Sequence, residues 1–149
     1  MAETQSEYID LELVTPEKLV LRESVLAVSL PGCDGYFGVL AGHAPLLSEL
    51  KPGELSYTRD FVNHYLCVDW GFAEVLPDRV TVLVETSELP EEIDTERARR
   101  ARERAEERLR RAGAGEAEID ALRAQTALER ATARLEVAQR ASNEVGAKS

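Results

Sequence analysis

The side chains that could carry out chemistry in this chain are few, and their spacing matches no catalytic or metal-binding motif. No nucleophile pattern accompanies His43, so we expect it to hydrogen-bond to turn backbone or to a partner subunit. Cys33, Cys67, His43 and His64 give the ligand count of a zinc site but form no C-x-x-C or H-x-x-x-H pair. We therefore expect no catalytic residue, no metal and two buried free thiols. An enzyme with its own active site is the weaker alternative, which turnover by the isolated chain would reveal.

The charge of the chain is unevenly distributed. The formal total is −10, but residues 1–93 hold 5 basic and 17 acidic residues, whereas residues 94–149 hold 13 and 11. The acidic first part argues against nucleic acid or an anionic membrane as its partner and favours a basic protein surface. No stretch approaches the about 20 apolar residues of a membrane span, and the N-terminus lacks a secretory signal. We expect a soluble, cytosolic protein.

The first part of the chain is predicted to be all β. Ile9–Leu13 alternates apolar with acidic residues, as a strand with one buried face does. Residues 64–75 are apolar on both alternating faces and predict one long buried strand, with a bulge at Trp70-Gly71-Phe72. Many short strands separated by Gly and Pro turns predict an antiparallel β-sandwich over residues 1–89.

Residues 90–149 are predicted to form an antiparallel two-helix hairpin, which makes the fold class α+β. The first helix spans Thr95–Ala112, with Asp94 as N-cap and Gly113 as the C′ residue. The second is expected from Glu116 to about Ala141. The two helices share an alanine-rich seam of Ala98, Ala101, Ala105, Leu109 and Ala112 on the first helix and Ala117, Ala121, Ala124, Leu128, Ala131, Leu135 and Ala138 on the second. Alanine buries little apolar area, so we expect an attachment of moderate stability.

A glycine-rich stretch, residues 35–55, carries the most specific pattern in the sequence. It reads Gly-x-x-Gly-x-x-x-Gly-His-x-Pro-Leu-Leu, followed by Lys-Pro-Gly-Glu-Leu, and it resembles the epsilon subunit of bacterial F-type ATP synthases. Glu74-Val75, residues 80–83 and Glu88-Leu89-Pro90 are similar in lesser motifs. The match departs at Tyr36-Phe37, where many relatives carry an acidic residue, and at Asp69-Trp70, where two small residues are common.

The resemblance implies a non-catalytic rotor subunit in the central stalk, which helps couple proton flow to ATP synthesis. Its expected partners are the gamma subunit, the ring of c subunits and the catalytic alpha and beta subunits, with no nucleic acid. It would lie peripherally at the cytoplasmic face of the bacterial cell membrane, held there only through the complex. The subunit interface is expected in the glycine-rich stretch, at Gly35, Tyr36, Gly38, Gly42, His43, Pro45 and Leu46.

In such subunits the hairpin lies folded on the sandwich or extends into the catalytic head and inhibits ATP hydrolysis. Eight arginines on the first helix suit contact with acidic segments of the beta subunits, and we assign inhibition to Arg108, Arg110 and Arg111. The alternative is that these arginines only solvate an exposed face and pair with neighbouring glutamates.

Residues 93–98 are similar to the I/L-D-x-x-R-A motif with which some epsilon subunits bind ATP as a regulatory ligand. No cofactor is required. The nucleotide-binding residues implied by the resemblance are Glu88, Asp94, Arg97, Ala98, Arg104, Arg130 and Arg134. Guanidinium groups match phosphate oxygens in shape and charge. The alternative is that Asp94 is only the N-cap and the arginines pair with Glu103 and Glu129.

A different class of function is a coiled-coil adaptor with the sandwich as a platform. The seam is short and rich in alanine, which specifies an intermolecular coiled coil poorly. An adaptor predicts a stable homodimer, whereas the rotor subunit predicts a monomer that binds gamma. Light scattering after size-exclusion chromatography separates the two.

Overall fold

Ten β-strands make up the first part of the computed structural model, which describes residues 6–116 and 118–147. They are β1 (Ile9–Val14), β2 (Leu19–Val25), β3 (Ala27–Gly32), β4 (Gly35–Leu40), β5 (Leu46–Leu50), β6 (Gly53–Arg59), β7 (Val62–Val68), β8 (Gly71–Leu76), β9 (Arg79–Val84) and β10 (Ser87–Glu88). The alternation of apolar and acidic residues in β1 predicted one buried face, and this prediction is confirmed, since Ile9, Leu11 and Leu13 are completely buried.

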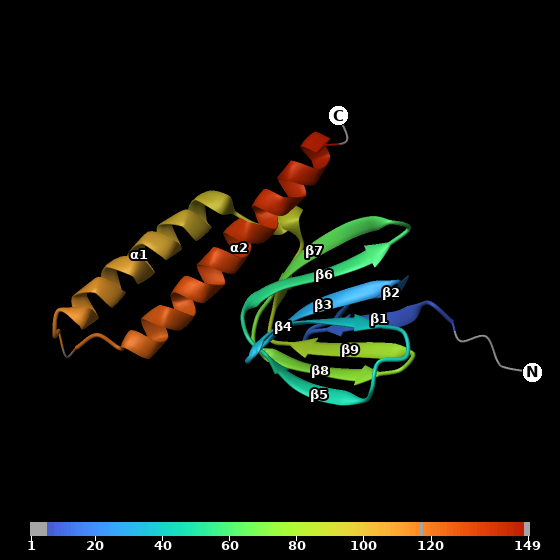
Figure 1. Ribbon diagram of the computed structural model, residues 1–149. Helices are drawn as coiled ribbons and strands as arrows, with labels where there is room; N and C mark the ends of the chain where they lie inside the picture. Colours follow the sequence, from blue (N-terminus) through green and yellow to red (C-terminus); the bar gives the residue numbers. More distant parts are fainter. Residues whose placement is uncertain (1–5, 117, 148–149) are drawn as a thin grey trace, which may run out of the picture.

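The strands form one sheet that folds over its own core as a sandwich (Figure 1). Their order is β10-β7-β6-β3-β5-β8-β9-β1-β2, with β4 added on β3. The sandwich is not purely antiparallel as predicted, because β1 lies between β2 and β9 and runs parallel to β9. Large aliphatic side chains from both layers fill the core, among them Leu30, Leu50 and Leu55.

The prediction of one long strand over residues 64–75 is wrong. The chain breaks at Asp69 and Trp70, so that β7 pairs with β6 and β10, while β8 pairs with β5 and β9. The Asp69 side chain accepts a hydrogen bond from the Trp70 N–H at 2.8 Å, which holds this bend. A Cβ atom on Gly71 would lie 1.9 Å from the Leu83 carbonyl oxygen, so close strand contact requires glycine here.

The two predicted helices are present, with shifted ends. A 3-10 turn, η1 (Pro90–Glu92), leads into α1 (Thr95–Gly113), and the second helix is α2 (Ala121–Ala147). The second helix begins five residues later than predicted, because Asp120 caps it by accepting from the Arg123 N–H at 3.1 Å. The C′ residue is Gly115, at φ +93°, rather than Gly113, because α1 extends through Gly113 and Ala114 is its C-cap.

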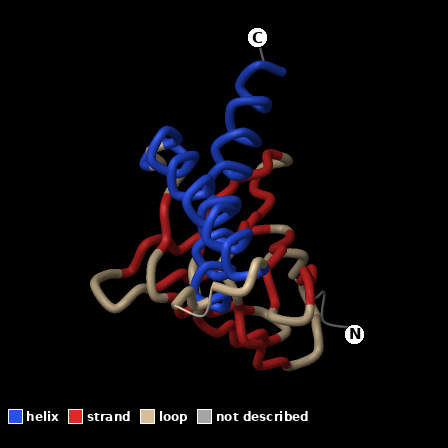
Figure 2. The backbone as a smooth tube through the Cα atoms, turned by 90° about the vertical axis from the view of Figure 1, so that its left-hand side faces the viewer, coloured by secondary structure: helices blue, strands red, loops and turns tan. Residues whose placement is uncertain are grey.

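The hairpin lies folded against the sandwich mainly through α2, which packs on β6 and β7 (Figures 1 and 2). The predicted alanine seam holds α1 to α2, with Ala98, Ala105, Ala124 and Ala131 almost fully buried. Ala117 lies outside the described residues. Within the described residues, no helix is both long and apolar enough to cross a membrane.

Candidate functional site

The hairpin meets the sandwich through a small apolar contact. Cys67, Ile93, Ala133 and Val137 form a buried cluster, with Tyr65 packed at its side. The cluster is separate from the sandwich core and contains no large aliphatic residue other than Ile93 and Val137. Burial raises the pKa of the Cys67 thiol to about 12, so this cysteine stays neutral and acts as a small apolar side chain.

Two arginines of α2, one helical turn apart, pair with two carboxylates of the sandwich. Arg134 Nε lies 2.6 Å from Glu88 Oε1, and Arg130 Nε lies 3.0 Å from Asp69 Oδ2. The carboxylates are neighbours because Glu88 pairs with Cys67 in the β10–β7 register and Asp69 follows shortly after Cys67. Two of the four arginines expected to bind phosphate are therefore engaged by protein carboxylates.

A second polar group lies further along α2. Arg140 Nε is 2.9 Å from Glu54 Oε2, and its guanidinium stands 5.8 Å from the centre of the Tyr65 ring. The Tyr65 hydroxyl donates to Glu144 at 2.8 Å. Burial raises the pKa of Glu54, an effect that Arg140 opposes and Glu136 reinforces. This group orients the C-terminal part of α2 over β6 and β7.

The remaining residues expected to bind nucleotide lie in the first half of α1 and at its N-cap. Asp94 caps the helix, because its side chain accepts from the Arg97 N–H at 3.0 Å. Ala98 is buried in the seam, whereas Arg97 and Arg104 are exposed. Ile93 packs under Val137 in the apolar contact, so the motif at residues 93–98 joins hairpin and sandwich.

A groove runs between α1 and α2 on one flank of the hairpin, and it serves as a reference for placing the arginines expected to bind nucleotide. Its lining residues are Thr95, Arg99, Arg102, Leu135, Ala138, Gln139, Ser142 and Asn143. At 100° per residue, Arg97 and Arg104 fall on the flank opposite Arg99 and Arg102. Arg130 likewise falls opposite Gln139. Helical spacing therefore places Arg97, Arg104 and Arg130 on the same flank of the hairpin, away from this groove.

The arginines assigned to inhibition lie near the free end of the hairpin, far from the sandwich in the chain's path (Figure 1). Arg110 pairs with Glu107 and Arg111 with Glu116, the latter at 2.7 Å, and these pairs raise the pKa of both arginines. Arg108 lines a hollow beside Asp120 and Arg123. Local pairing with glutamates, the alternative stated above, is therefore present for two of the three.

The glycine-rich stretch forms an ordered corner between β4 and β5. Gly42, at φ +85°, donates its N–H to the Pro77 carbonyl at 2.7 Å. His43 Nδ1 lies 2.6 Å from the Ala44 carbonyl oxygen, so the proton resides on Nδ1 and the ring fixes the turn. The residues expected at the interface follow one another along the corner: Gly35, Tyr36 and Gly38 in β4, Gly42 and His43 in the turn, Pro45 before β5 and Leu46 within it.

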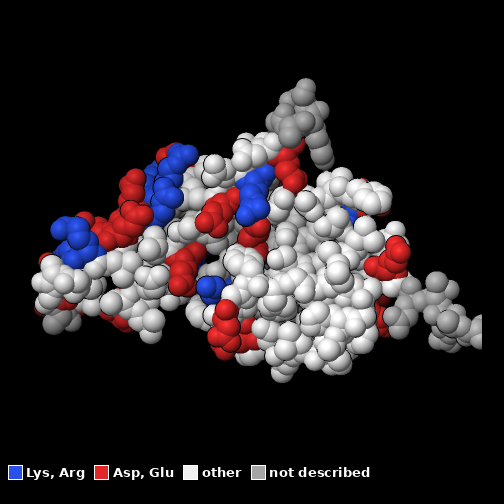
Figure 3. Space-filling view, viewed as in Figure 1, with Lys and Arg blue, Asp and Glu red and all other residues white. Residues whose placement is uncertain are grey.

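The outer face of the sandwich carries a row of apolar side chains that the sequence analysis missed. The register aligns Phe72, Leu83, Val14 and Leu19 across β8, β9, β1 and β2, and we call these four residues the outer apolar row. Phe72 and Leu83 are each 52% exposed. Figure 3 shows that this side of the sandwich is largely uncharged over β5, β8 and β9. Exposed apolar patches of this kind mark interaction surfaces.

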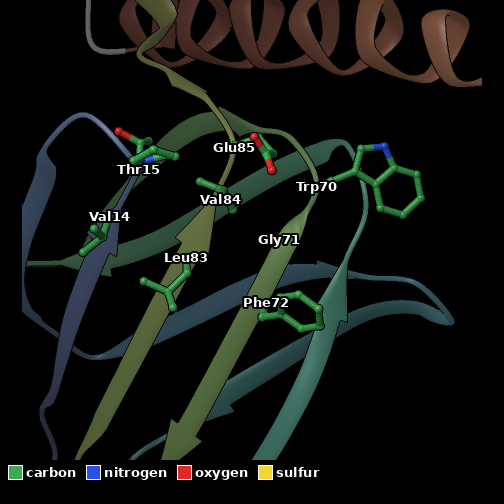
Figure 4. A pocket seen from close by; sticks show the side chains of 9 residues that line it. Val14, Thr15, Trp70, Gly71, Phe72, Leu83, Val84 and Glu85 are labelled. Carbon is green, nitrogen blue, oxygen red and sulfur yellow. The ribbon is translucent and has the colours of Figure 1, made fainter.

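A shallow cavity opens at one end of the outer apolar row, between the β1–β2 turn and the start of β8 (Figure 4). It has a volume of about 340 Å³ and is lined by Val14, Thr15, Pro16, Trp70, Gly71, Phe72, Leu83, Val84 and Glu85. Alternation in single strands could have identified its residues as outward-facing. Their alignment into one row depends on the parallel β1–β9 pair, which the sequence did not reveal.

The cysteines and histidines of the conceivable zinc site have separate surroundings. His64 stacks on the Tyr57 ring, with ring centres 4.9 Å apart, and Cys67 faces α2. Cys33 is exposed in the β3–β4 turn, which corrects the expectation of two buried thiols. The sequence places Cys33 after Pro31-Gly32, and a two-residue hairpin turn leaves its side chains in solvent. Among the described residues, no cluster of three or more metal-ligating side chains occurs.

The sequence of the chain matches two family models. Residues 8–90 match the beta-sandwich domain of the ATP synthase delta/epsilon chain, and residues 91–139 match its long alpha-helix domain. The chain is 53% identical over 104 residues to the ATP synthase epsilon chain of Koribacter versatilis, covering 70% of this chain and 73% of that protein. It is 54% identical over 106 residues to the ATP synthase epsilon chain of Geotalea daltonii, covering 71% and 77%.

Two solved structures have a similar fold. A chain of the Euglena gracilis mitochondrial ATP synthase, a structure of OSCP, F1 and c-ring, is 26% identical with a TM-score of 0.78, over 92% of this chain and 84% of that one. A chain of the Tetrahymena thermophila mitochondrial ATP synthase central stalk and c-ring has a TM-score of 0.52 at 15% identity, over 93% and 98%. At that identity the second likeness shows the fold alone.

Proposed function

The chain belongs to the ATP synthase delta/epsilon family, and from this premise we propose that it is a non-catalytic central-stalk subunit that couples proton flow to ATP synthesis. Its partners in this proposal are the gamma subunit, the c-subunit ring and the catalytic alpha and beta subunits. The resemblance to assemblies containing F1 and c-ring supports this placement. The subunit is held at the cytoplasmic face of the bacterial membrane through the complex.

The outer apolar row is the observation that carries the proposed contact with gamma. Phe72 and Leu83 are about half exposed in the middle of a sheet, and Leu47 on the neighbouring β5 is 72% exposed. Acidic side chains border these residues, including Glu49, which is opposite Phe72 in the register. A partner that covers this face therefore presents an apolar stripe flanked by basic residues.

Binding to gamma is tested by Phe72→Asp in the full chain. A buried charge at the centre of the contact should abolish co-purification with gamma, because interface cores exclude unpaired charges. Phe61→Asp is the matched control, since Phe61 is 93% exposed and lies outside the outer apolar row. Both variants should keep the circular dichroism of the parent. Retained binding by Phe72→Asp would refute this interface.

The hairpin is proposed to inhibit ATP hydrolysis when it leaves the sandwich. The small apolar contact around Val137 and the partly exposed ion pairs of Arg130 and Arg134 support an attachment that can open. The basic free end of α1, with Arg108, Arg110 and Arg111, suits acidic segments of the catalytic head. The pairs of Arg110 and Arg111 with glutamates are exposed and can exchange for partner carboxylates.

Inhibition is tested in the assembled enzyme by removing residues 90–149. Hydrolysis should rise, and the variant with Arg108, Arg110 and Arg111 all changed to Glu should raise it too, more strongly at low salt. The matched control changes the same three residues to Lys, which keeps the charge and should keep inhibition. Unchanged hydrolysis in the deletion and the Glu variant would leave these arginines as a solvated surface.

Nucleotide binding to the folded hairpin is the second regulatory element of the proposal. Arg97, Arg104 and Arg130 fall on one flank of the hairpin, and Arg134 follows Arg130 by one turn, which together supply enough positive charge for a triphosphate. Asp94 and Glu88 are acceptors for the ribose or the base. Bound ATP would favour the folded hairpin by its greater affinity for that state and so relieve inhibition.

Nucleotide binding is tested by titrating MgATP into the isolated chain with calorimetry. Saturable binding that Arg130→Ala and Asp94→Ala both weaken supports the site. Arg99→Ala is the matched control, because Arg99 lines the groove on the opposite flank. No saturation at millimolar ATP, or equal weakening by all three variants, would refute the site while leaving the stalk assignment in place.

A further inference from the structure

Asp69 is a carboxylate that its own backbone fixes beside an arginine of α2. Its Oδ1 accepts from the Trp70 N–H at 2.8 Å and lies 3.1 Å from Arg130 Nε, while Oδ2 lies 3.0 Å from the same nitrogen. The Asp69 side chain is 16% exposed, whereas that of Arg130 is 43% exposed. The Asp69 carboxylate is therefore held in place by the sandwich backbone, whereas Arg130 reaches it only when α2 is docked.

The four charges at this junction cancel. Asp69 and Glu88 face Arg130 and Arg134, and each arginine is already in contact with one carboxylate. A triphosphate bound to these two arginines takes the place of a carboxylate or stands next to it. Like charges a few ångströms apart repel each other, and the repulsion is weakest in water and strongest where the charges are sheltered.

We propose that Asp69 sets the affinity of the folded hairpin for nucleoside triphosphates by competing with the phosphates for Arg130. This rests on the nucleotide site proposed above. Asp69 contributes no contact to the ligand, in contrast to Glu88, which has an assigned role toward the ribose or base. Neutralising Asp69 therefore raises affinity, whereas removing Glu88 also removes a ligand contact.

A purely structural role of Asp69 predicts the opposite sign. If the ion pair with Arg130 served only to dock the hairpin, Asp69→Asn would favour the detached hairpin. Nucleotide affinity would then fall, because the site exists only in the folded arrangement. The direction of the change in Kd thus separates competition from docking. Asparagine keeps an oxygen acceptor for the Trp70 N–H and so preserves the bend between β7 and β8.

The experiment titrates MgATP, and separately magnesium tripolyphosphate, into the full-length parent and Asp69→Asn. We expect Kd to fall by about tenfold for both probes at low salt, the size expected from removing one nearby unit charge. The gain should shrink as salt is added, since the Debye length is about 8 Å at physiological ionic strength. The same gain for both probes locates the competition at the phosphates.

Two controls carry the same change in charge elsewhere. Glu54→Gln alters the Arg140 pair, another contact between hairpin and sandwich, and Asp78→Asn alters an exposed turn distant from α2. Asp78→Asn should leave Kd unchanged, and Glu54→Gln should change it by less than Asp69→Asn does, because its effect on docking is small. Equal or weaker binding by Asp69→Asn, an equal gain in the controls, or no saturable binding by any variant would overturn the inference. Absence of saturable binding by the parent refutes the nucleotide site itself, whereas saturable binding without a gain in Asp69→Asn refutes only the competition, so the two failures are distinguishable.

Discussion

The sandwich and the hairpin are stabilised by different kinds of contact. The sandwich surrounds a core of leucine, isoleucine and valine from both layers, with many of these side chains completely buried. The hairpin is held together by an alanine seam and held to the sandwich by Ile93, Val137, small neighbours and partly exposed ion pairs. An alanine side chain buries less apolar area than leucine, isoleucine or valine, so the two regions should differ in stability and in their freedom to move.

The largest expected effect is a core deletion in the sandwich. Leu30 is completely buried, and Leu30→Ala should lower the free energy of unfolding by about 2–5 kcal/mol, through lost transfer energy and the cavity left behind. Urea denaturation measures the change in the free energy of unfolding. Hydrogen exchange of the backbone amides in β3 reports the same change locally. Leu135→Ala in the hairpin is the matched control, because Leu135 is only partly buried and contributes to the helical groove.

The control should leave exchange in the sandwich strands unchanged and raise it in α1 and α2. If Leu135→Ala destabilised the strands as much as Leu30→Ala does, the two regions would unfold as one cooperative unit. The comparison drawn above would then fail.

A smaller effect is expected where the hairpin meets the sandwich. Val137 is completely buried, and Val137→Ala should weaken docking by about 2 kcal/mol, from two methyl groups at about 0.8 kcal/mol each plus a small cavity. Hydrogen exchange should rise in α2 and leave the sandwich core protected. Leu122→Ala is the matched control, because Leu122 also lies in α2 but is 77% exposed.

The sequence predicts those parts of the fold that depend on local patterns. The alternation of apolar and acidic residues in β1 predicts that Ile9, Leu11 and Leu13 are buried. The spacing of alanines by four and three residues predicts the seam between the helices. The break after Val68 was not predictable, since both neighbouring strands are apolar on each face. The hydrogen bond from the Trp70 N–H to the Asp69 side chain holds the bend there, and β7 and β8 pair with different strands on its two sides.

The candidate site shows the same division between local and long-range features. Asp94 as N-cap follows from its position before a helical sequence and is observed. The pairing of Asp69 with Arg130 joins residues 61 positions apart, and no local pattern links them. The outer apolar row likewise depends on β1 inserting beside β9, a pairing between the first strand and the ninth.

A third effect is the pH dependence of docking at Glu54. Burial raises its pKa and Arg140 only partly opposes this. The folded protein therefore binds the Glu54 proton more tightly than the unfolded one. The stabilising contribution is fully present below the ordinary carboxyl pKa and is lost as pH rises through the folded-state pKa.

It follows that Glu54→Gln should make the protein slightly more stable than the parent at pH 7, by under about 1 kcal/mol, despite losing an ion pair. The advantage should vanish near pH 4, where the parent is protonated too. Urea midpoints measured at both pH values check this. Lower stability of the variant at pH 7 would mean that the Arg140 pair outweighs the cost of burying the charge.

The smallest expected effect is a gain in the sandwich alone. The β6–β7 turn places Asp60 at φ +52° and Phe61 at φ +61°, a backbone region that costs a residue with a side chain about 1–2 kcal/mol. Phe61 is 93% exposed, so its ring gains little from burial. Phe61→Gly should raise the free energy of unfolding by about 0.5 kcal/mol, because the unfolded glycine gains entropy that offsets part of the relieved strain.

The Phe61→Gly substitution also tests whether the two regions are independent. The turn joins the two strands that α2 contacts, yet Phe61 itself lies outside the buried cluster around Val137. Exchange in β6 and β7 should slow while exchange in α2 stays the same. Phe61→Ala is the matched control, since alanine removes the ring but keeps the strain and should gain nothing. If slower exchange spread into α2, the sandwich surface would control docking, and hairpin and sandwich could not be tuned separately.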